Sequence, residues 1–196
     1  MMDFKLTEKF LFVVRHGERS DYVYNATPVN SDDPNLTKHG KKQAKKTGEF
    51  LGSKLARFNP KVRIIASPLI RTIQTAFEIA KQLGVAEIEI DNRFIERMNP
   101  DIMSVDSDKL EIRTKSLEYI KDTYLGDEGR NDITLIDNNS DYSHLDLKRC
   151  ESRHSSRNRV MKYFNQVISD EIDTKEYDAT IVVTHGFVVD EFSYQY

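Results

Sequence analysis

The sequence contains a single cysteine, Cys150, in 196 residues, so no disulfide bond can form within the chain. Because proteins of oxidising compartments commonly depend on disulfides, we expect a reducing, cytoplasmic location. No apolar run approaches the roughly 20 residues that span a bilayer. Residues 1–9 are mixed and polar, without the apolar core of a signal peptide. We therefore expect no membrane partner.

A basic excess is also missing, because the formal net charge is -3. Proteins that bind nucleic acid usually have a basic surface, so we predict no nucleic-acid partner. The sequence has no internal repeat and no low-complexity tract, and its length suits a single domain over residues 1–196. The oligomeric state is left open.

Patterns typical of metal sites and of cysteine-dependent phosphatases are absent as well. His39, His144 and His154 do not have the spacing of metal ligands, so we expect neither a metal nor a cofactor. A cysteine-dependent phosphatase needs an arginine six positions after its cysteine, and that position holds Ser156. No glycine-rich phosphate loop is present either.

What the sequence does have is a set of short apolar runs. Residues 10–14, 62–66 and 179–183 are rich in β-branched or aromatic residues, as expected of strands buried on both faces. Residues 88–90 form a weaker fourth strand. Helices are predicted between these strands, so we expect an α/β fold, a three-layer sandwich around a mostly parallel sheet.

Three helices can be placed by their apolar spacing and their caps. Thr37 is a plausible N-cap for the first, whose apolar face continues to Phe58. The second runs from near Pro68 to about residue 83, where Gly84 suits its C-terminal stop. The third covers residues 157–172.

The region from residue 99 to residue 153 is rich in Asp, Asn and Ser. It contains one helix candidate, over residues 108–124. We interpret residues 99–153 as an insertion or lid within the single domain, and residues 131–153 as its most flexible part.

Charged and histidine side chains follow each strong strand. Ligands of open α/β sheets bind beyond the carboxyl ends of the strands. If the three strands are parallel neighbours, one edge of the sheet brings together two histidines and three arginines, which are His16, His185, Arg15, Arg19 and Arg71.

This set of side chains suits phosphoryl transfer. Arginines match the geometry of phosphate oxygens, and a neutral histidine can attack phosphorus to form a covalent intermediate. The leaving group needs a proton, for which we choose Glu96, after the weak fourth strand, with Glu18 as a rival. Arginines can supply the positive charge, so no divalent metal is needed. Two alternatives give these residues no catalytic role. Arg19 could pair with Asp21 or Glu18 on a loop, and Glu96 could be an ordinary surface carboxylate.

Residues 15–17, Arg-His-Gly, resemble the motif that defines the histidine phosphatase (phosphoglycerate mutase-like) superfamily. The resemblance extends to four further segments, which are residues 36–48, 67–76, 94–96 and 184–186. It implies that His16 is the nucleophile and Glu96 the probable acid. It also implies that Arg15, Arg71 and His185 bind the phosphate, with His185 part of the catalytic group.

Two details narrow the resemblance. Residues 15–21, Arg-His-Gly-Glu-Arg-Ser-Asp, are similar to the phosphatase domains of the suppressor-of-T-cell-receptor-signalling proteins, in which the arginine matching Arg19 also lines the phosphate pocket. Phosphoglycerate mutases continue their motif with Glu-Ser and Trp-Asn, and this chain has no tryptophan, so mutase activity is disfavoured. The family normally continues past its second histidine through a helix and a final strand, and we expect both to be missing here.

The sequence therefore predicts a metal-independent phosphomonoester hydrolase of the histidine acid phosphatase type, with a phosphohistidine intermediate on His16. Its substrate would be a phosphorylated small molecule or a phosphoprotein. The alternative is a catalytically weak or inactive phosphate-binding module of the same fold.

Overall fold

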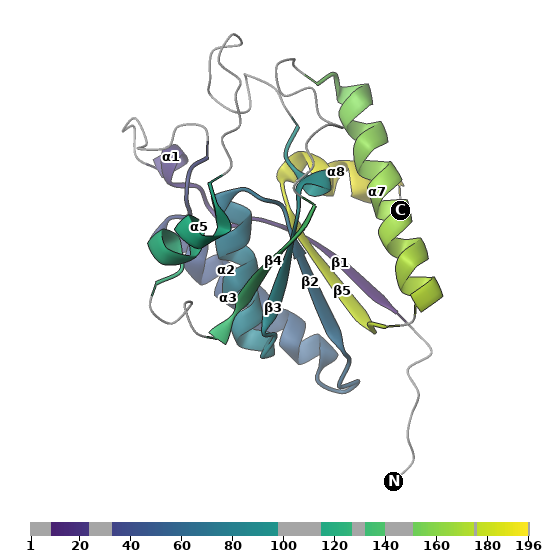
Figure 1. Cartoon of the computed structure of the whole chain (residues 1–196), viewed down its shortest axis with the longest axis horizontal. Helices are drawn as coiled ribbons and strands as arrows, with labels where there is room; N and C mark the ends of the chain where they lie inside the picture. Colours follow the sequence, from purple (N-terminus) through teal and green to yellow (C-terminus); the bar gives the residue numbers. More distant parts are fainter. Residues whose placement is uncertain are drawn as a thin grey trace.

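The fold is that of a computed structural model, which describes residues 9–23, 33–97, 115–126, 132–139, 151–174 and 176–195. Within these residues a single sheet of five parallel strands runs through the centre of the molecule (Figure 1). Its order is β1-β5-β2-β3-β4, with β1 Phe10–Arg15, β2 Val62–Ala66, β3 Glu87–Asp91, β4 Thr134–Asn139 and β5 Ala179–Thr184. The predicted α/β class and parallel sheet are confirmed.

The strand β5 lies at the centre of the arrangement, and all six of its residues are buried. It pairs with β1 on one side and with β2 on the other, as its continuous run of β-branched residues predicts. The register aligns Val14 and Ala66 with Val183. Because the three strands end level with one another, the loops that follow them start at the same edge of the sheet.

One face of the sheet is covered by α2 (Lys38–Leu55), α3 (Ile70–Leu83) and α5 (Leu117–Tyr124). Thr37 caps α2 by accepting a hydrogen bond from the Gly40 amide, as predicted. Gly84 ends α3 with a φ of 66°, a left-handed conformation that favours glycine. Apolar residues of these helices, such as Leu51 and Phe77, pack with Ile64 and Val183 of the sheet.

The opposite face is covered by α7 (Arg153–Thr174) and α8 (Gly186–Gln195). Phe164 of α7 and Val188 of α8 pack against Ile65 and Val182, which point from β2 and β5 to this side. Two short elements lie at the carboxyl edge: α1 (Ser20–Val23) after β1, and the 3₁₀ helix η1 (Asn92–Phe94) after β3. The predicted three-layer arrangement is confirmed. No helix in the described part of the chain is long and apolar enough to cross a membrane.

The structure differs from the sequence expectations in the region 99–153. Strand β4, Thr134–Asn139, lies there and pairs with β3 as the fifth strand of the sheet, in a stretch expected to be flexible. The helix predicted over residues 108–124 appears as α5, which starts only at Leu117 with Ser116 as its N-cap. Residues 108–114 lie outside the described residues. Helix α7 begins four residues earlier than expected. The assignment of residues 99–153 to an insertion within a single domain stays a prediction.

A helix is also present directly after His185. The ten residues of α8 bring Phe187, Val188 and Phe192 into contact with the core on the side of α7. Ten residues complete almost three helical turns, which is enough to bury one apolar face. The chain therefore has a helix directly after His185, and the absence of the family's C-terminal helix and last strand stays a prediction.

Candidate active site

The carboxyl edge of the sheet collects the loops that carry the predicted residues. The amide of His16 donates to the Thr184 carbonyl at 2.9 Å, and the amide of Ser67 donates to the Val183 carbonyl at 3.0 Å. These bonds extend the ladders of β1 and β2 with β5 by one residue. They fix the loops after all three strands against each other.

His16 is held with one ring nitrogen ready to react. Its side chain is only 8% exposed, and its Nδ1 lies 2.7 Å from the Gly17 carbonyl oxygen. Because a carbonyl oxygen can only accept a hydrogen bond, Nδ1 carries the proton and Nε2 has the lone pair. Burial, with the nearby charge of Arg71 and then of Arg15 and Arg19, lowers the pKa of His16 to about 3. His16 is therefore neutral near pH 7.

Arg71 brings a positive charge into the interior from the first turn of α3. Its side chain is fully buried, and its Nη1 lies 3.4 Å from Asp33 Oδ1. Within the described residues its Nε and Nη2 have no hydrogen-bond partner. Burial lowers the pKa of Arg71 to about 10, an effect that the charge of Asp33 opposes, so the guanidinium stays charged near pH 7. Buried donors without partners favour the binding of an anion.

His185 and Glu96 face each other beside His16. The centres of the two histidine rings are 5.4 Å apart. His185 is fully buried, with Nε2 at 2.7 Å from Ser67 Oγ and Nδ1 at 3.8 Å from Glu96 Oε2. Its Nδ1 has no hydrogen-bond partner in the described part of the structure. Burial, then the charge of Arg71, lowers the pKa of His185 well below its ordinary value.

Glu96 is only 5% exposed, so the alternative that it is an ordinary surface carboxylate is wrong. Burial raises its pKa, although the Arg97 amide, which donates to Oε1 at 2.9 Å, opposes this shift. A raised pKa keeps more of the carboxyl in its protonated form. Glu96 can therefore hold a proton close to the two histidines.

Arg15 and Arg19 lie on the pocket side of the site, where Arg15 is exposed and Arg19 is buried. Together with His16 and Tyr22 they line a pocket of about 450 Å³, whose other wall includes Gln43 and Thr47 of α2. Arg71, His185 and Glu96 are buried and are not among the described residues of this lining. Of the six predicted residues, Arg15, His16 and Arg19 line the pocket, and the other three are buried behind it.

Arg19 pairs with Asp21, as the alternative without a catalytic role suggested. Its Nε and Nη2 donate to the two carboxylate oxygens of Asp21 at 3.0 and 2.5 Å, and its Nη1 donates to the Tyr22 hydroxyl at 3.3 Å. Its charge nevertheless contributes to the low pKa of His16. Arg19 therefore contributes its charge to the site while three of its five N–H donors bind residues of its own turn.

Glu18 holds the loop after β1 against α2. Its carboxylate accepts from the Thr37 hydroxyl at 2.6 Å, and its amide donates to Gln43 Oε1 at 2.9 Å. The loop and the helix touch at Gly17 and Gly40, because a Cβ added to Gly17 would lie 2.5 Å from the Gly40 carbonyl oxygen. These contacts indicate that Glu18 stabilises the packing of the loop on α2, so Glu96 remains the better candidate for the acid.

The family of the chain follows from its similarity to known sequences. The sequence profile of the histidine phosphatase superfamily (branch 1) matches residues 11–194. The chain belongs to this superfamily. No curated protein matches the sequence significantly.

Solved structures with the same fold agree with this assignment. The ecdysone phosphate phosphatase of Bombyx mori, in complex with tungstate, superimposes with a TM-score of 0.62 at 18% identity, over 95% of this chain and 76% of that one. A mycobacterial glucosyl-3-phosphoglycerate phosphatase gives 0.55 at 18% identity, over 94% and 80%. The phosphoglycerate mutase of Bacillus anthracis gives 0.58 at 19% identity, over 94% and 78%. The phosphoglycerate mutase-like fold is confirmed.

Several residues of this histidine phosphatase site were missed by sequence reasoning. Asp33 accepts from the Ile70 amide at 3.0 and 3.1 Å and lies beside Arg71. Arg159 of α7 is buried near Glu96. Both contact residues that are distant in the sequence, so no local spacing pattern predicts their place in the site. Ser67 and Thr184 belong to motifs already recognised, but their partners become visible only in the structure.

The remaining histidines lie away from this site or outside the described residues. His39 and His154 are exposed, on α2 and α7, and His144 is in an undescribed segment. Within the described residues, no group of three or more histidine, cysteine and carboxylate side chains is arranged to hold a metal ion.

Proposed function

We propose that the chain is a metal-independent phosphomonoester hydrolase in which His16 is transiently phosphorylated. The observation that carries this proposal is the state of His16, a neutral imidazole with its Nε2 free and three arginine charges around it. Neutral imidazole is the nucleophilic form, and the arginines attract the phosphate that it attacks. Membership of the histidine phosphatase superfamily supports phosphoester chemistry.

In the proposed first step, His16 Nε2 attacks phosphorus in line with the ester oxygen. A P–N bond forms as the P–O bond breaks, and the leaving alkoxide takes a proton from the Glu96 carboxyl. In the second step, water attacks the phosphohistidine and gives a proton to the Glu96 carboxylate. The P–N bond breaks, inorganic phosphate leaves, and His16 and Glu96 return to their starting states.

The phosphate oxygens are proposed to bind the unpartnered buried donors. Arg71 offers Nε and Nη2, and we assign the proton of His185 to Nδ1, so that the Ser67 hydroxyl donates to Nε2. Arg15 approaches from the pocket side. Arg19 contributes its charge, while its Nε and one N–H of Nη2 stay on Asp21. Fixed positive charges of this kind stabilise the charge that is redistributed during phosphoryl transfer.

The substrate is proposed to be a phosphorylated small molecule or a phosphorylated protein side chain. The pocket beside His16, of about 450 Å³, lies in the size range of small-molecule sites. Two of the similar structures are phosphatases named for ecdysone phosphate and for glucosyl-3-phosphoglycerate, which are small phosphorylated molecules. The single cysteine supports a cytoplasmic location for the reaction.

Hydrolysis of p-nitrophenyl phosphate in the presence of EDTA tests this proposal. Wild type should turn over at a rate that ignores the chelator, and His16→Ala should lose turnover without loss of fold. His39→Ala, which removes an exposed histidine, is the matched control and should keep full activity. A folded wild type without turnover would favour the inactive phosphate-binding alternative, and activity retained by His16→Ala would exclude the phosphohistidine mechanism.

A further inference from the structure

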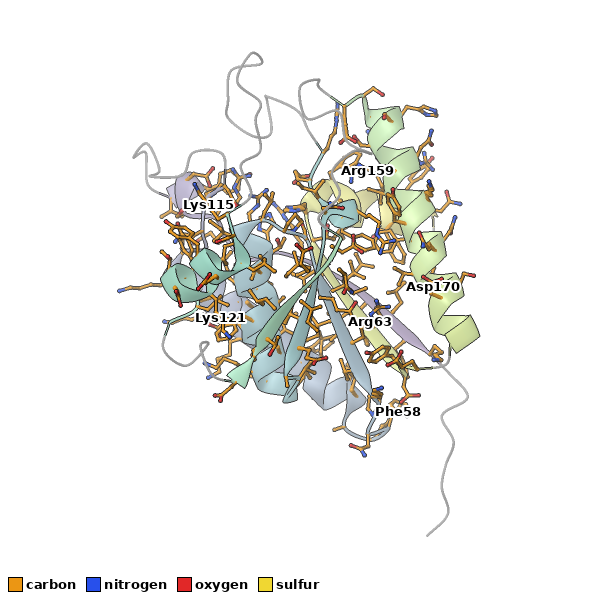
Figure 2. The ribbon with its side chains drawn as sticks, in the orientation of Figure 1. Phe58, Arg63, Lys115, Lys121, Arg159 and Asp170 are labelled. Atoms are coloured by element: carbon orange, nitrogen blue, oxygen red, sulfur yellow. The ribbon has the colours of Figure 1, made fainter. Side chains whose placement is uncertain are left out.

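Arg159 is a buried arginine to which the proposed mechanism gives no role. It lies in the second turn of α7, only 8% exposed, where the helix passes the end of β3 (Figure 2). Its Nε and Nη2 donate to the two carboxylate oxygens of Glu151 at 2.9 and 2.8 Å. This pairing neutralises the charge but leaves further N–H donors of the guanidinium available.

Those donors bind the backbone of residues 93–97, which we call the acid loop because it contains Glu96. Arg159 Nη1 donates to the carbonyls of Arg93 and Ile95 at 3.0 and 3.1 Å. Its Nη2 lies 3.4 Å from the Glu96 carbonyl. One planar side chain therefore holds three of the loop's carbonyl oxygens.

The acid loop has two further anchors on either side of this contact. The Thr184 hydroxyl donates to the Phe94 carbonyl at 2.7 Å, so the residue before His185 also binds the loop. Arg97 Nε donates to the Glu151 carbonyl at 3.2 Å. Four consecutive carbonyls, from residue 93 to residue 96, thus accept hydrogen bonds from side chains.

The position of the Glu96 carboxyl depends on this backbone. Its Oε1 accepts from the neighbouring Arg97 amide, and its Oε2 lies 3.8 Å from His185 Nδ1. A proton donor must lie within hydrogen-bond reach of the leaving oxygen, and a misplacement of about 1 Å can cost roughly a hundredfold in rate. We propose that Arg159 is the positioning residue that sets the Glu96 carboxyl against the leaving group; this inference rests on the proposed function.

A purely structural role is the competing explanation. The same helix carries Arg153 and Arg157, whose Nε atoms lie 2.8 and 3.5 Å from the buried carboxylate of Glu191 on α8. That contact joins α7 to α8 through side chains and involves no carbonyl of the acid loop. Arg157 is thus a matched control, a second α7 arginine paired with a buried carboxylate.

The test compares an alkyl phosphate with p-nitrophenyl phosphate, whose leaving group needs little protonation. Arg159→Lys keeps a positive charge beside Glu151 but has no planar fork to hold three carbonyls. It should lower kcat/KM for the alkyl phosphate at least about tenfold more than kcat/KM for the aryl phosphate, because general acid catalysis of leaving-group departure contributes roughly 10²–10⁴-fold. Arg157→Leu should have the same alkyl-to-aryl ratio of kcat/KM as wild type.

A second variant guards against simple loss of fold. Arg159→Leu combined with Glu151→Leu removes both charges together, so no buried charge is left unpaired. It should show the same selective loss on the alkyl phosphate. The inference is wrong, and the proposed function stands, if both Arg159 variants lower kcat/KM equally for the two substrates. The same holds if they keep the wild-type alkyl-to-aryl ratio of kcat/KM while Glu96→Gln loses it. A wild type without His16-dependent turnover overturns both.

Discussion

Burial acts in opposite directions on the two titratable groups that the proposed reaction uses. It lowers the pKa of His16 to about 3 and raises the pKa of Glu96. In both cases the neutral form is favoured, which is the nucleophilic form of an imidazole and the proton-donating form of a carboxyl. The same low-dielectric site therefore prepares both groups for the first step.

Replacement of the proposed acid should separate substrates by their leaving groups. Glu96→Gln keeps the shape of the side chain but cannot donate a carboxyl proton. We expect kcat/KM for an alkyl phosphate to fall at least about a hundredfold, within the range for general acid catalysis, and that for p-nitrophenyl phosphate to fall much less. Equal losses on both substrates would remove Glu96 from the role of acid.

The pH profile of wild type gives an independent reading of the same residue. Once each kcat/KM is corrected for the ionisation of its own substrate phosphate, the alkyl-to-aryl ratio should fall as pH rises through the raised pKa of Glu96 and the proton is lost. His16, with a pKa of about 3, should add no limb to either profile above about pH 4. The ratio for Glu96→Gln should not change with pH.

At the scale of elements, the contact between the loop after β1 and helix α2 places His16. Gly17 and Gly40 meet where any larger residue would collide with backbone. A Cβ on Gly40 would lie 2.4 Å from the Glu18 carbonyl oxygen, a distance that backbone atoms cannot accept. The glycine of the Arg-His-Gly motif and that of residues 36–40 are therefore two sides of one packing contact.

Gly40→Ala should consequently damage activity although residue 40 lies outside the pocket lining. The displaced loop should move His16, and we expect kcat/KM for p-nitrophenyl phosphate to fall at least about tenfold, since small misplacements are costly. Gly52→Ala on the same helix is the matched control, because its Cβ would meet only Leu83 Cδ2 at 3.4 Å. It should keep full activity and gain up to about 1 kcal/mol in free energy of unfolding from helix propensity. Similar activities for the two variants would contradict this account of the contact.

The elements were predictable from the sequence where apolar runs and helix caps mark them. The apolar runs of β1, β2 and β5, the cap at Thr37 and the stop at Gly84 all appear as the sequence predicts. The sequence does not predict β4, because its residues Asp137 and Asn138 are polar and exposed and no apolar run marks the strand. Its place in the sheet is decided by pairing with β3, which no local pattern encodes.

At the scale of the whole molecule, the parallel order of the strands explains why the candidate site could be assembled from sequence. Residues that follow three neighbouring strands must meet at one edge. Contacts between distant elements could not be read in this way. Asp33 reaches Arg71, and Arg159 reaches the acid loop, through geometry that only the packed layers create.

Two neutral histidines buried beneath arginines should also make the stability of the whole molecule depend on pH. Below pH 6.5 an unfolded chain protonates the imidazole of His16, whereas the folded protein takes up that proton only near pH 3. Acid therefore favours the unfolded chain, and the free energy of unfolding should fall as pH is lowered from 6.5 towards 3. The slope from one such histidine is up to about 1.4 kcal/mol per pH unit.

Urea unfolding of wild type and His16→Asn at several pH values measures this effect. The raised pKa of Glu96 acts in the opposite sense, since its proton stabilises the folded state, but it is common to both proteins. The stability difference between the variant and wild type should shift in favour of the variant as pH falls below 6.5, the ordinary histidine value. A difference independent of pH would contradict the buried, neutral state of His16.

Detection of the phosphoenzyme tests the central claim most directly. The enzyme would be mixed with p-nitrophenyl phosphate and quenched rapidly in alkali, which preserves a P–N bond, and its peptides analysed by mass spectrometry. We predict a phosphate group on His16 in wild type, absent from His16→Ala and lost when the sample is acidified. Turnover with no phosphate on His16, or with phosphate on a different residue, would contradict the mechanism.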